Sequence, residues 1–340
     1  MDFDEKFELI KRNTQEIVGE DELKELLKER NMKVYLGTAI TGRPHIGYFV
    51  PMIKISDFLK AGSDVTIMLA DLHALLDDLK TPFELLDARY KYYKDVIKGM
   101  LISIGTDITK LHFKRGSEFE LNKEYSLDVY KMASIVSLRN TQKAAAEVVR
   151  FGENPRVGGF IYPIMQALDE VYLNVDAQYG GVDQRKILMF ARENLPKIGY
   201  KSRIEIMTPM IPGLSGKKMS SSEENSKIDL LDDDQNIKKK VNSAFCPEGV
   251  VENNGILAFV KNVVMILKKD KNEDFIIKRP EKFGGDIIYR NYSDLEKDFV
   301  EKQLHPMDLK IGVAEEIIKL IKPIREIMKD KEEIIKKAYP

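Results

Sequence analysis

Two short segments of this chain carry residues suited to holding phosphate groups. Pro44-His45-Ile46-Gly47 follows an apolar run, and Lys218-Met219-Ser220-Ser221-Ser222 follows a loop rich in glycine. Helix N-termini bind phosphate through free backbone N–H groups, and a lysine can neutralise a departing pyrophosphate. Taken alone, the first segment could be an ordinary turn and the second a solvated linker. Together, and in this order, they predict a nucleoside triphosphate that is held from two sides.

A third group of polar residues lies within the apolar stretch at residues 160–168. If this stretch is helical, Tyr162, Gln166 and Asp169 recur at positions i, i+4 and i+7 and share one face. A phenol, an amide and a carboxylate are costly to bury without polar partners. A partly exposed face is the alternative, but it fits poorly with the apolar neighbours. An amino acid substrate with a phenol would satisfy all three side chains.

A fourth group, Gly180-Gly181-Val182-Asp183-Gln184, follows a run that is typical of a strand. A pair of glycines lets the backbone approach a ligand closely, and the Asp183 carboxylate could accept hydrogen bonds from ribose hydroxyls. The alternative is an ordinary turn in which Asp183 caps a helix. The two roles are compatible.

Composition and residue spacing exclude several other classes of site. The four histidines and the single cysteine, Cys246, match no zinc spacing, so no protein-held metal site is expected. There is no G-x-x-x-x-G-K-[ST] phosphate loop, and Cys246 is expected to be a buried thiol. With one cysteine no intramolecular disulfide can form, which favours a reducing, cytoplasmic location.

The overall charge and hydropathy add further limits. The formal net charge of the 340 residues is −1, which argues against a strongly basic nucleic-acid surface but allows a local basic face. The acidic N-terminus resembles no secretory signal or transit peptide. No apolar run is long enough to cross a bilayer, so no membrane partner is expected.

The elements that position these residues alternate between strand and helix. Apolar runs predict strands at residues 33–38, 64–70, 177–182 and 204–207, with helices between them. This pattern is typical of an α/β fold with a mostly parallel sheet, in which ligands bind at the carboxyl ends of the strands. We also predict a helix after Pro44 with Pro51 near its start, a capping box at Thr81 that opens a helix toward Gly105, and one long helix at residues 126–150.

Three regions are predicted along the chain. Residues 1–30 read as a helical arm, residues 31–222 as the catalytic domain, and residues 223–340 as a helical domain in which Asp232-Asp233-Asp234 caps the first helix. The boundary is placed in the loop that carries Lys218.

As a set, these segments resemble the class I aminoacyl-tRNA synthetases, whose HIGH and KMSKS signatures look like residues 44–47 and 218–222. The wider context resembles the tyrosyl-tRNA synthetases of the archaeal and eukaryotic cytosolic type, through residues 35–39, 70–74, 162–169, 180–186 and 305–310. Tyr48 stands where the first signature usually has a second histidine, and Ser221 where the second signature has its second lysine. The resemblance implies a Rossmann-like catalytic domain with a connective insertion at about residues 110–160, and a helical anticodon-binding domain.

The resemblance also implies roles for individual residues. In this family, residues matching Tyr35 and Asp169 bond the phenolic hydroxyl of tyrosine, and those matching Tyr162, Gln166 and Gln184 hold its amino group. The ATP-binding and catalytic positions are Gly37, Ala39, His45, Gly47, Gly180, Asp183, Lys218, Met219, Ser220 and Ser222. Mg²⁺ would arrive with ATP.

The remaining implications concern RNA and a second subunit. The residue matching Phe283 stacks on the first anticodon base of tRNA(Tyr), and those matching His305 and Asp308 read it as well. The alternative is a purely structural role, in which Phe283 packs in the core and His305 and Asp308 belong to an ordinary helix start. The family is homodimeric, with its interface near residues 110–160.

Three rival functions stay open at this point. A tryptophanyl-tRNA synthetase shares the fold and the signatures, but a carboxylate at Asp169 beside Tyr35 favours a phenol. A small-molecule nucleotidyltransferase would not need the helical region after Leu231. A catalytically inactive relative that binds RNA would not need both His45 and Lys218.

Overall fold

The computed structural model describes residues 1–77, 81–149, 151–216 and 227–340. Its centre is a six-stranded sheet in the order β1-β6-β5-β2-β3-β4. The strands run parallel, except that β1 pairs with β6 in the antiparallel direction. Their bounds are β1 (Glu16–Val18), β2 (Lys33–Ala39), β3 (Asp64–Ala70), β4 (Leu111–Arg115), β5 (Ala177–Gly181) and β6 (Ile204–Thr208).

Helices cover both faces of this sheet, because alternate strand residues point to opposite faces. On β2, Val34 and Leu36 belong to an apolar cluster with Phe49 and Phe58 of α3. Tyr35, which lies between them, points to the other face and bonds a carbonyl of α9. The helices of this region are α1 (Phe3–Lys11), α2 (Glu20–Glu29), α3 (Phe49–Lys60), α4 (Asp71–Leu76), α5 (Leu86–Ser103), α6 (Ser117–Glu120), α7 (Lys123–Ile135), α8 (Leu138–Ala145), α9 (Val157–Tyr172) and α10 (Arg185–Asn194).

The strand order creates a crevice at the centre of the sheet. The chain leaves β2 through α3 to reach β3 on one side, and it later returns to β5 on the other side. Strand order reverses between β2 and β5, and ligands of open α/β sheets bind beyond the carboxyl ends of the strands at such a point. His45 follows β2, and Gly180 is in the last part of β5.

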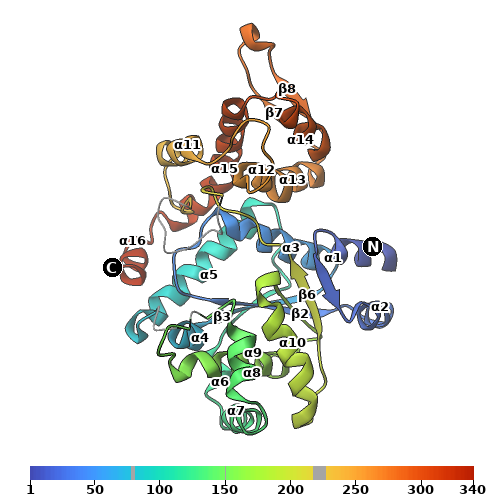
Figure 1. The fold of residues 1–340 in the computed structure, drawn as a ribbon, viewed down its shortest axis with the longest axis vertical. Helices are drawn as coiled ribbons and strands as arrows, with labels where there is room; N and C mark the ends of the chain where they lie inside the picture. Colours follow the sequence, from blue (N-terminus) through green and yellow to red (C-terminus); the bar gives the residue numbers. More distant parts are fainter. Residues whose placement is uncertain (78–80, 150, 217–226) are drawn as a thin grey trace.

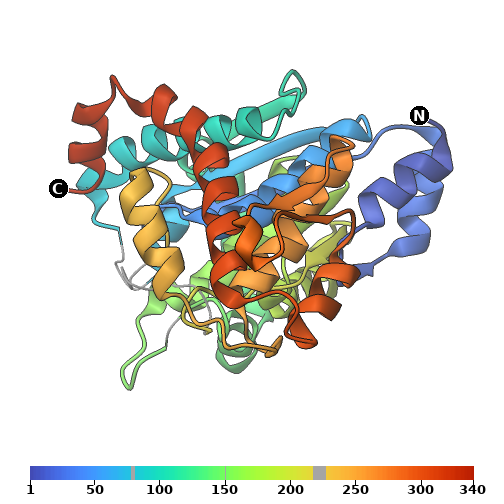
Figure 2. The same cartoon turned by 90° about the horizontal axis from the view of Figure 1, so that it is seen from above.

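The C-terminal region is mostly helical and packs directly on the sheet region. Helix α15 contacts α5, and one apolar core cluster contains residues from Phe7 to Ala338. Figure 1 shows most of these helices at one end of the molecule, and Figure 2 shows the N-terminal helices and the chain's C-terminus on opposite sides. The elements are α11 (Asp234–Ser243), α12 (Gly255–Phe259), α13 (Met265–Asp270), α14 (Tyr292–Val300), α15 (Pro306–Met328), α16 (Glu332–Ala338) and the hairpin strands β7 (Phe275–Ile277) and β8 (Ile287–Tyr289).

This architecture confirms the predicted α/β fold with a parallel sheet and a helical C-terminal region. Pro51 lies in the first turn of α3, as predicted, and Asp233 caps α11 by accepting from Asn236 N. The β7–β8 hairpin and the edge strands β1 and β4 were not predicted. Strand β4 lies at the start of residues 110–160, the range predicted for the connective insertion. The domain boundaries stay a prediction. Within the described residues, no helix combines the length and apolarity needed to span a membrane.

Two local predictions are wrong. Residues 126–150 do not form one helix, because Val136 is extended and the Ser137 side chain caps a second helix by accepting from Asn140 N. Thr81 does not form a capping box. Its buried hydroxyl donates to the carbonyl of Ile40 at 3.1 Å instead, and α5 begins only at Leu86.

Candidate active site

A cavity of about 260 Å³ lies beyond the carboxyl ends of β2 and β5, at the point where strand order reverses. Its walls come from both halves of the sheet region and from the segment after β6. The sequence-predicted site residues that line it are Gly37, His45, Gly47, Gln166, Gly180, Asp183 and Gln184. Ala39 is not among the lining residues.

His45 caps the short 3₁₀ helix that precedes α3. Its Nδ1 accepts a hydrogen bond from Gly47 N at 3.2 Å, so Nε2 carries the proton. Burial, together with the charge of Lys227, lowers the pKa of His45 to about 4. The ring is therefore a neutral hydrogen-bond donor at pH 7. Tyr48 stands where the family signature usually has a second histidine. Its ring lies edge-to-face with the His45 ring, with 5.3 Å between the ring centroids.

The second signature, Lys218 to Ser222 with Met219 and Ser220, lies outside the described residues. The chain that follows it is placed beside His45. Ile46 N donates to the carbonyl of Ile228 at 3.1 Å, and His45 and Asp229 form an isolated antiparallel bridge. The segment that leaves this signature therefore runs along the residues of the first one.

The opposite wall of the cavity contains amide and carboxylate groups. Gln166 Nε2 donates to Gln184 Oε1 at 3.3 Å across this wall. The second glycine of the pair at the end of β5 has a structural reason. A Cβ at Gly181 would lie only 2.6 Å from Asp183 Oδ1. The wall thus presents the Asp183 carboxylate and the amides of Gln166, Gln178 and Gln184 to a ligand.

Three predicted residues, Tyr35, Tyr162 and Asp169, lie directly behind this wall and do not line the cavity. Their exposed fractions are 0%, 6% and 0%. The Tyr35 hydroxyl donates to the carbonyl of Gln166 at 3.3 Å, and the charge of Asp169 contributes to a pKa of Tyr35 that burial raises well above its usual value. The phenol therefore bonds the backbone of α9 one turn before Asp169, and of these residues Gln166 is the one that lines the cavity.

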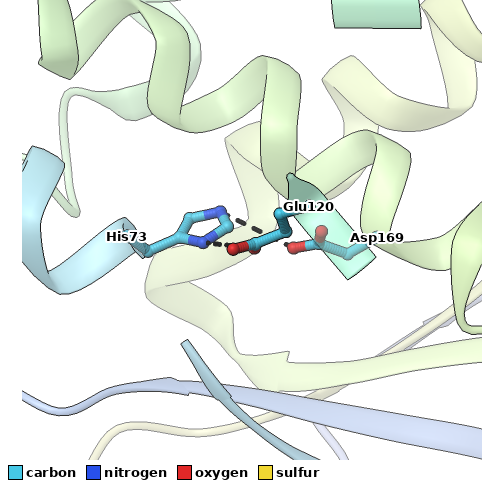
Figure 3. A group of neighbouring side chains, drawn as sticks. All are labelled: His73, Glu120 and Asp169. Atoms are coloured by element: carbon cyan, nitrogen blue, oxygen red, sulfur yellow. Dashed lines mark ion pairs between the residues drawn. The ribbon is translucent and has the colours of Figure 1, made fainter. Parts of the chain in front are cut away.

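Three further residues surround Asp169 that the sequence did not single out by function. Tyr125 donates to Asp169 Oδ1 at 2.8 Å. On the other side His73 Nε2 lies 3.6 Å from Asp169 Oδ2, and His73 Nδ1 lies 3.1 Å from Glu120 Oε1. Figure 3 shows the three side chains of His73, Glu120 and Asp169 pointing toward one another. His73 follows the end of β3 by three residues, which is a signal that sequence reasoning could have used.

Asp169 Oδ2 has no hydrogen-bond partner within the described structure, although it is fully buried. Orphaned buried acceptors are rare and mark places where a ligand or water belongs. A hydroxyl donor at this position would satisfy it.

His73, Glu120 and Asp169 also form the one group in the described chain with metal-compatible spacing, because their donor atoms lie within 4.8 Å of one another. The imidazole already faces a carboxylate with each of its nitrogens, so a protonated ring neutralises charge here without an ion. We assign no metal to this group.

The residues predicted to read the anticodon lie at the opposite end of the C-terminal region. Phe283 is 61% exposed and is not packed in the core. It lies on the connection between β7 and β8, which projects far from the sheet (Figure 1). His305 caps α15 through Nδ1, and Asp308 in the first turn lies 3.8 Å from the Arg279 guanidinium. The hairpin and the start of α15 therefore form one surface.

Comparisons with known proteins agree with this geometry. Residues 27–322 match the family model of the class I tRNA synthetases (W and Y). The chain belongs to this family. The cytoplasmic tyrosine–tRNA ligase of Danio rerio is 56% identical over 339 residues, and the match covers 99% of this chain and 63% of that protein. The tyrosine–tRNA ligase of Haloarcula marismortui is 47% identical, over 100% of this chain and 98% of that protein.

A solved tyrosyl-tRNA synthetase from Archaeoglobus fulgidus, in complex with L-tyrosine, superposes on this chain with a TM-score of 0.88. Its sequence is 40% identical, and the match covers 96% of this chain and all of that one. Within its family the chain belongs to the tyrosyl branch, of the archaeal and eukaryotic cytosolic type. It spans about 63% of the length of its vertebrate relatives.

Proposed function

We propose that this protein is a tyrosine–tRNA ligase, which activates L-tyrosine with ATP and transfers the tyrosyl group to the 3′ end of tRNA(Tyr). The observation that carries the proposal is the buried Asp169 Oδ2, which accepts no hydrogen bond in the described structure and faces His73 Nε2 at 3.6 Å, behind a cavity that His45 and Gly47 line. A phenol hydroxyl fits the first site, and a nucleotide phosphate fits the second. The named relatives support the same activity.

Activation needs no protein nucleophile, because the tyrosine carboxylate attacks the α-phosphate of ATP in line and pyrophosphate departs. The protein contributes position and charge. The His45 Nε2–H faces the phosphates, Gly47 beside it allows them to approach closely, and Lys218, Ser220 and Ser222 approach from the other side. Mg²⁺ arrives with ATP. A terminal ribose hydroxyl of the tRNA then takes the tyrosyl group from the adenylate.

Substrate binding uses the two walls of the cavity. Gln166, Gln184 and Tyr162 hold the amino group, and the phenol passes Gln166 to reach Tyr35 and Asp169. Adenosine lies over the end of β5, where Gly180 allows close approach and Asp183 accepts from the ribose. Gly37, Ala39 and Met219 complete the ATP site.

Recognition of tRNA involves the far end of the C-terminal region. The exposed ring of Phe283 is suited to stack on a splayed base, and His305 and Asp308 offer polar groups to a base edge nearby. We place the anticodon there. Cytoplasmic action is supported by the names of the relatives.

The tryptophanyl alternative is less well supported, since an indole N–H on Asp169 would leave the Tyr35 hydroxyl no substrate oxygen to bond. ATP–pyrophosphate exchange with the twenty amino acids offered singly separates the two enzymes. We expect exchange with tyrosine at least 10³-fold above that with tryptophan or phenylalanine, by analogy with sites built to bond a hydroxyl. Exchange driven best by tryptophan, or by no amino acid, would refute the proposed function.

A homodimer is part of the proposal, and it is supported by apolar side chains that α7 and α8 leave exposed. Leu127, Tyr130, Ile135 and Leu138 are 52%, 71%, 44% and 66% exposed. Such a patch marks an association surface. We expect Leu138→Glu to convert the dimer to a monomer in sedimentation experiments, because a charge would be buried in the interface. The matched control is Ile102→Glu on α5, which replaces an equally apolar exposed residue outside the patch and should leave the dimer intact.

A further inference from the structure

Behind the cavity, one imidazole faces two carboxyl groups. His73 lies 3.1 Å from Glu120 and 3.6 Å from Asp169, and all three side chains are at most 2% exposed (Figure 3). One imidazolium neutralises one carboxylate. The second carboxyl group must then carry a proton, or the cluster buries an uncompensated negative charge, which is strongly unfavourable in a low-dielectric interior. Two acids that share one cation therefore hold an extra proton.

The geometry indicates which acid keeps that proton. Glu120 is the nearer partner of His73, and it is held in place by its own turn. A Cβ on Gly116 would lie 2.5 Å from Glu120 Oε2, and Glu120 N donates to the carbonyl of Gly116 at 3.0 Å. The absence of a side chain at Gly116 thus leaves room for the Glu120 carboxylate. Glu120 forms the ion pair with the imidazolium, and the extra proton stays on Asp169.

We propose that Glu120, acting through His73, keeps Asp169 protonated in the free enzyme, and that tyrosine binding releases this proton, so that Glu120 couples phenol recognition to pH. The inference rests on the proposed function, since it requires a phenol against Asp169. The substrate keeps its own phenolic proton and donates it in a hydrogen bond to the ionised Oδ2. The proton that leaves Asp169 passes to the solvent. Glu120 and His73 are positioning residues here, because they act through Asp169.

The direction of two pKa shifts agrees with this assignment. Burial and then the charge of Glu120 raise the pKa of Asp169 well above its usual range, against the opposing effects of His73 and Tyr125. Burial lowers the pKa of His73, but the charges of Glu120, Asp169 and Asp71 together outweigh it and raise that pKa above 6.5.

The other titratable groups around Asp169 leave this balance in place. Tyr125 on α7 and Tyr35 on β2 are phenols whose pKa burial raises well above 10, so both are neutral. The nearby cations act on other acids, since Arg115 pairs with Asp71, and Arg203 and Arg192 act on Glu170. The remaining groups are Tyr162 and Glu170 on α9 itself, both with raised pKa, and Glu205 on β6, which acts on Glu170.

The sign of the pH effect follows from the raised pKa. Below it Asp169 is protonated in the free enzyme, and as pH rises through it the carboxylate forms without the help of the substrate. The KM for tyrosine should therefore fall with rising pH, by up to about tenfold per pH unit below that pKa. In Glu120→Gln the imidazolium serves Asp169 alone, which lowers the pKa of Asp169. The variant should have a lower KM at acid pH and a flat profile.

The test is the pH dependence of KM in tyrosine-driven pyrophosphate exchange. We expect a sloping profile for the wild type, a flat one for Glu120→Gln, and no change in the KM for ATP in either. Glu118→Gln is the matched control, because it removes the same charge from an exposed position of the same helix, α6. A Glu120→Gln profile parallel to that of the wild type would overturn the proposal, and so would a flat wild-type profile.

A second measurement counts the protons directly. Calorimetry of tyrosine binding in buffers of different ionisation enthalpy should show release of up to one proton by the wild type and none by Glu120→Gln. If thermal melting shows that Glu120→Gln does not fold, Gly116→Ala provides the same comparison, because its Cβ displaces the Glu120 carboxylate. Tyrosine binding without proton release in the wild type refutes this inference alone. A wild type that does not take tyrosine refutes the proposed function.

Discussion

Replacing His45 with alanine is expected to lower the rate of tyrosine-dependent pyrophosphate exchange by about 10²–10³, with the affinity for tyrosine little changed. The reason is geometric. His45 Nδ1 is occupied by Gly47 N, so the remaining Nε2–H is a fixed neutral donor on the cavity wall. A donor of this kind is worth most where charge develops on the phosphates, and the proposed site of the tyrosine side chain lies behind the opposite wall.

Two controls separate this role from a structural one. His112→Ala removes an exposed histidine on β4 and should leave exchange unchanged. His45→Asn keeps an N–H donor and should recover part of the rate. Because burial places the pKa of His45 at about 4, this residue should contribute no inflection to the rate between about pH 5.5 and 8. If His45→Ala exchanges pyrophosphate at nearly the wild-type rate, His45 does not act on the phosphates.

The same reasoning applies to Lys218, which lies outside the described residues. Lys218→Ala is expected to slow exchange by a similar factor, since a lysine neutralises the departing pyrophosphate. The segment that follows this signature is placed beside His45 through Ile46 N and the carbonyl of Ile228. That pairing is the structural support for a nucleotide held from two sides.

Sequence reasoning found the strands inside the sheet and missed those at its edges. β2 and β3 contain apolar runs, as strands buried on both faces do, and the predicted β5 and β6 are buried as well, although Gln178 and Glu205 interrupt their apolar residues. β1 has three residues and β4 alternates between partly buried and exposed positions, because both lie at the edges of the sheet. Edge strands carry a weaker pattern, and only their pairing with β6 and β3 makes them recognisable.

The candidate site divides along a similar line. His45, Gly47, Gly180 and Gln184 could be predicted to meet, because all lie at or just after the carboxyl ends of strands that border one crevice. Glu120 could not, since it ends a helix of four residues that has no periodicity to read. Its role depends on a contact with His73, which is far from Glu120 in the sequence. A local sequence pattern cannot reveal such a contact.

The second large effect is expected at Asp169. Asp169→Asn should reduce the discrimination between tyrosine and phenylalanine by roughly 10²-fold, because a hydrogen bond to a charged group is worth about 1.5–3 kcal/mol. Tyrosyl-tRNA synthetases as a class discriminate by about 10⁵, a figure that belongs to the class and does not follow from these distances. The loss should appear in kcat/KM for tyrosine and leave kcat/KM for phenylalanine nearly unchanged.

Stability gives this prediction its control. Asp169→Asn replaces a carboxyl group that is protonated in the free enzyme, and His73 keeps Glu120 as its partner at 3.1 Å, so no buried cation is left uncompensated. The free energy of unfolding should therefore not fall by more than about 1 kcal/mol. Replacing one of the two acids that share His73 can even raise this free energy. Glu118→Gln again serves as the variant in which neither quantity moves. If Asp169→Asn unfolds early and keeps full selectivity, Asp169 is a structural acid and the phenol is recognised elsewhere. If selectivity falls while stability holds, the orphaned Oδ2 is the group that receives the substrate hydroxyl.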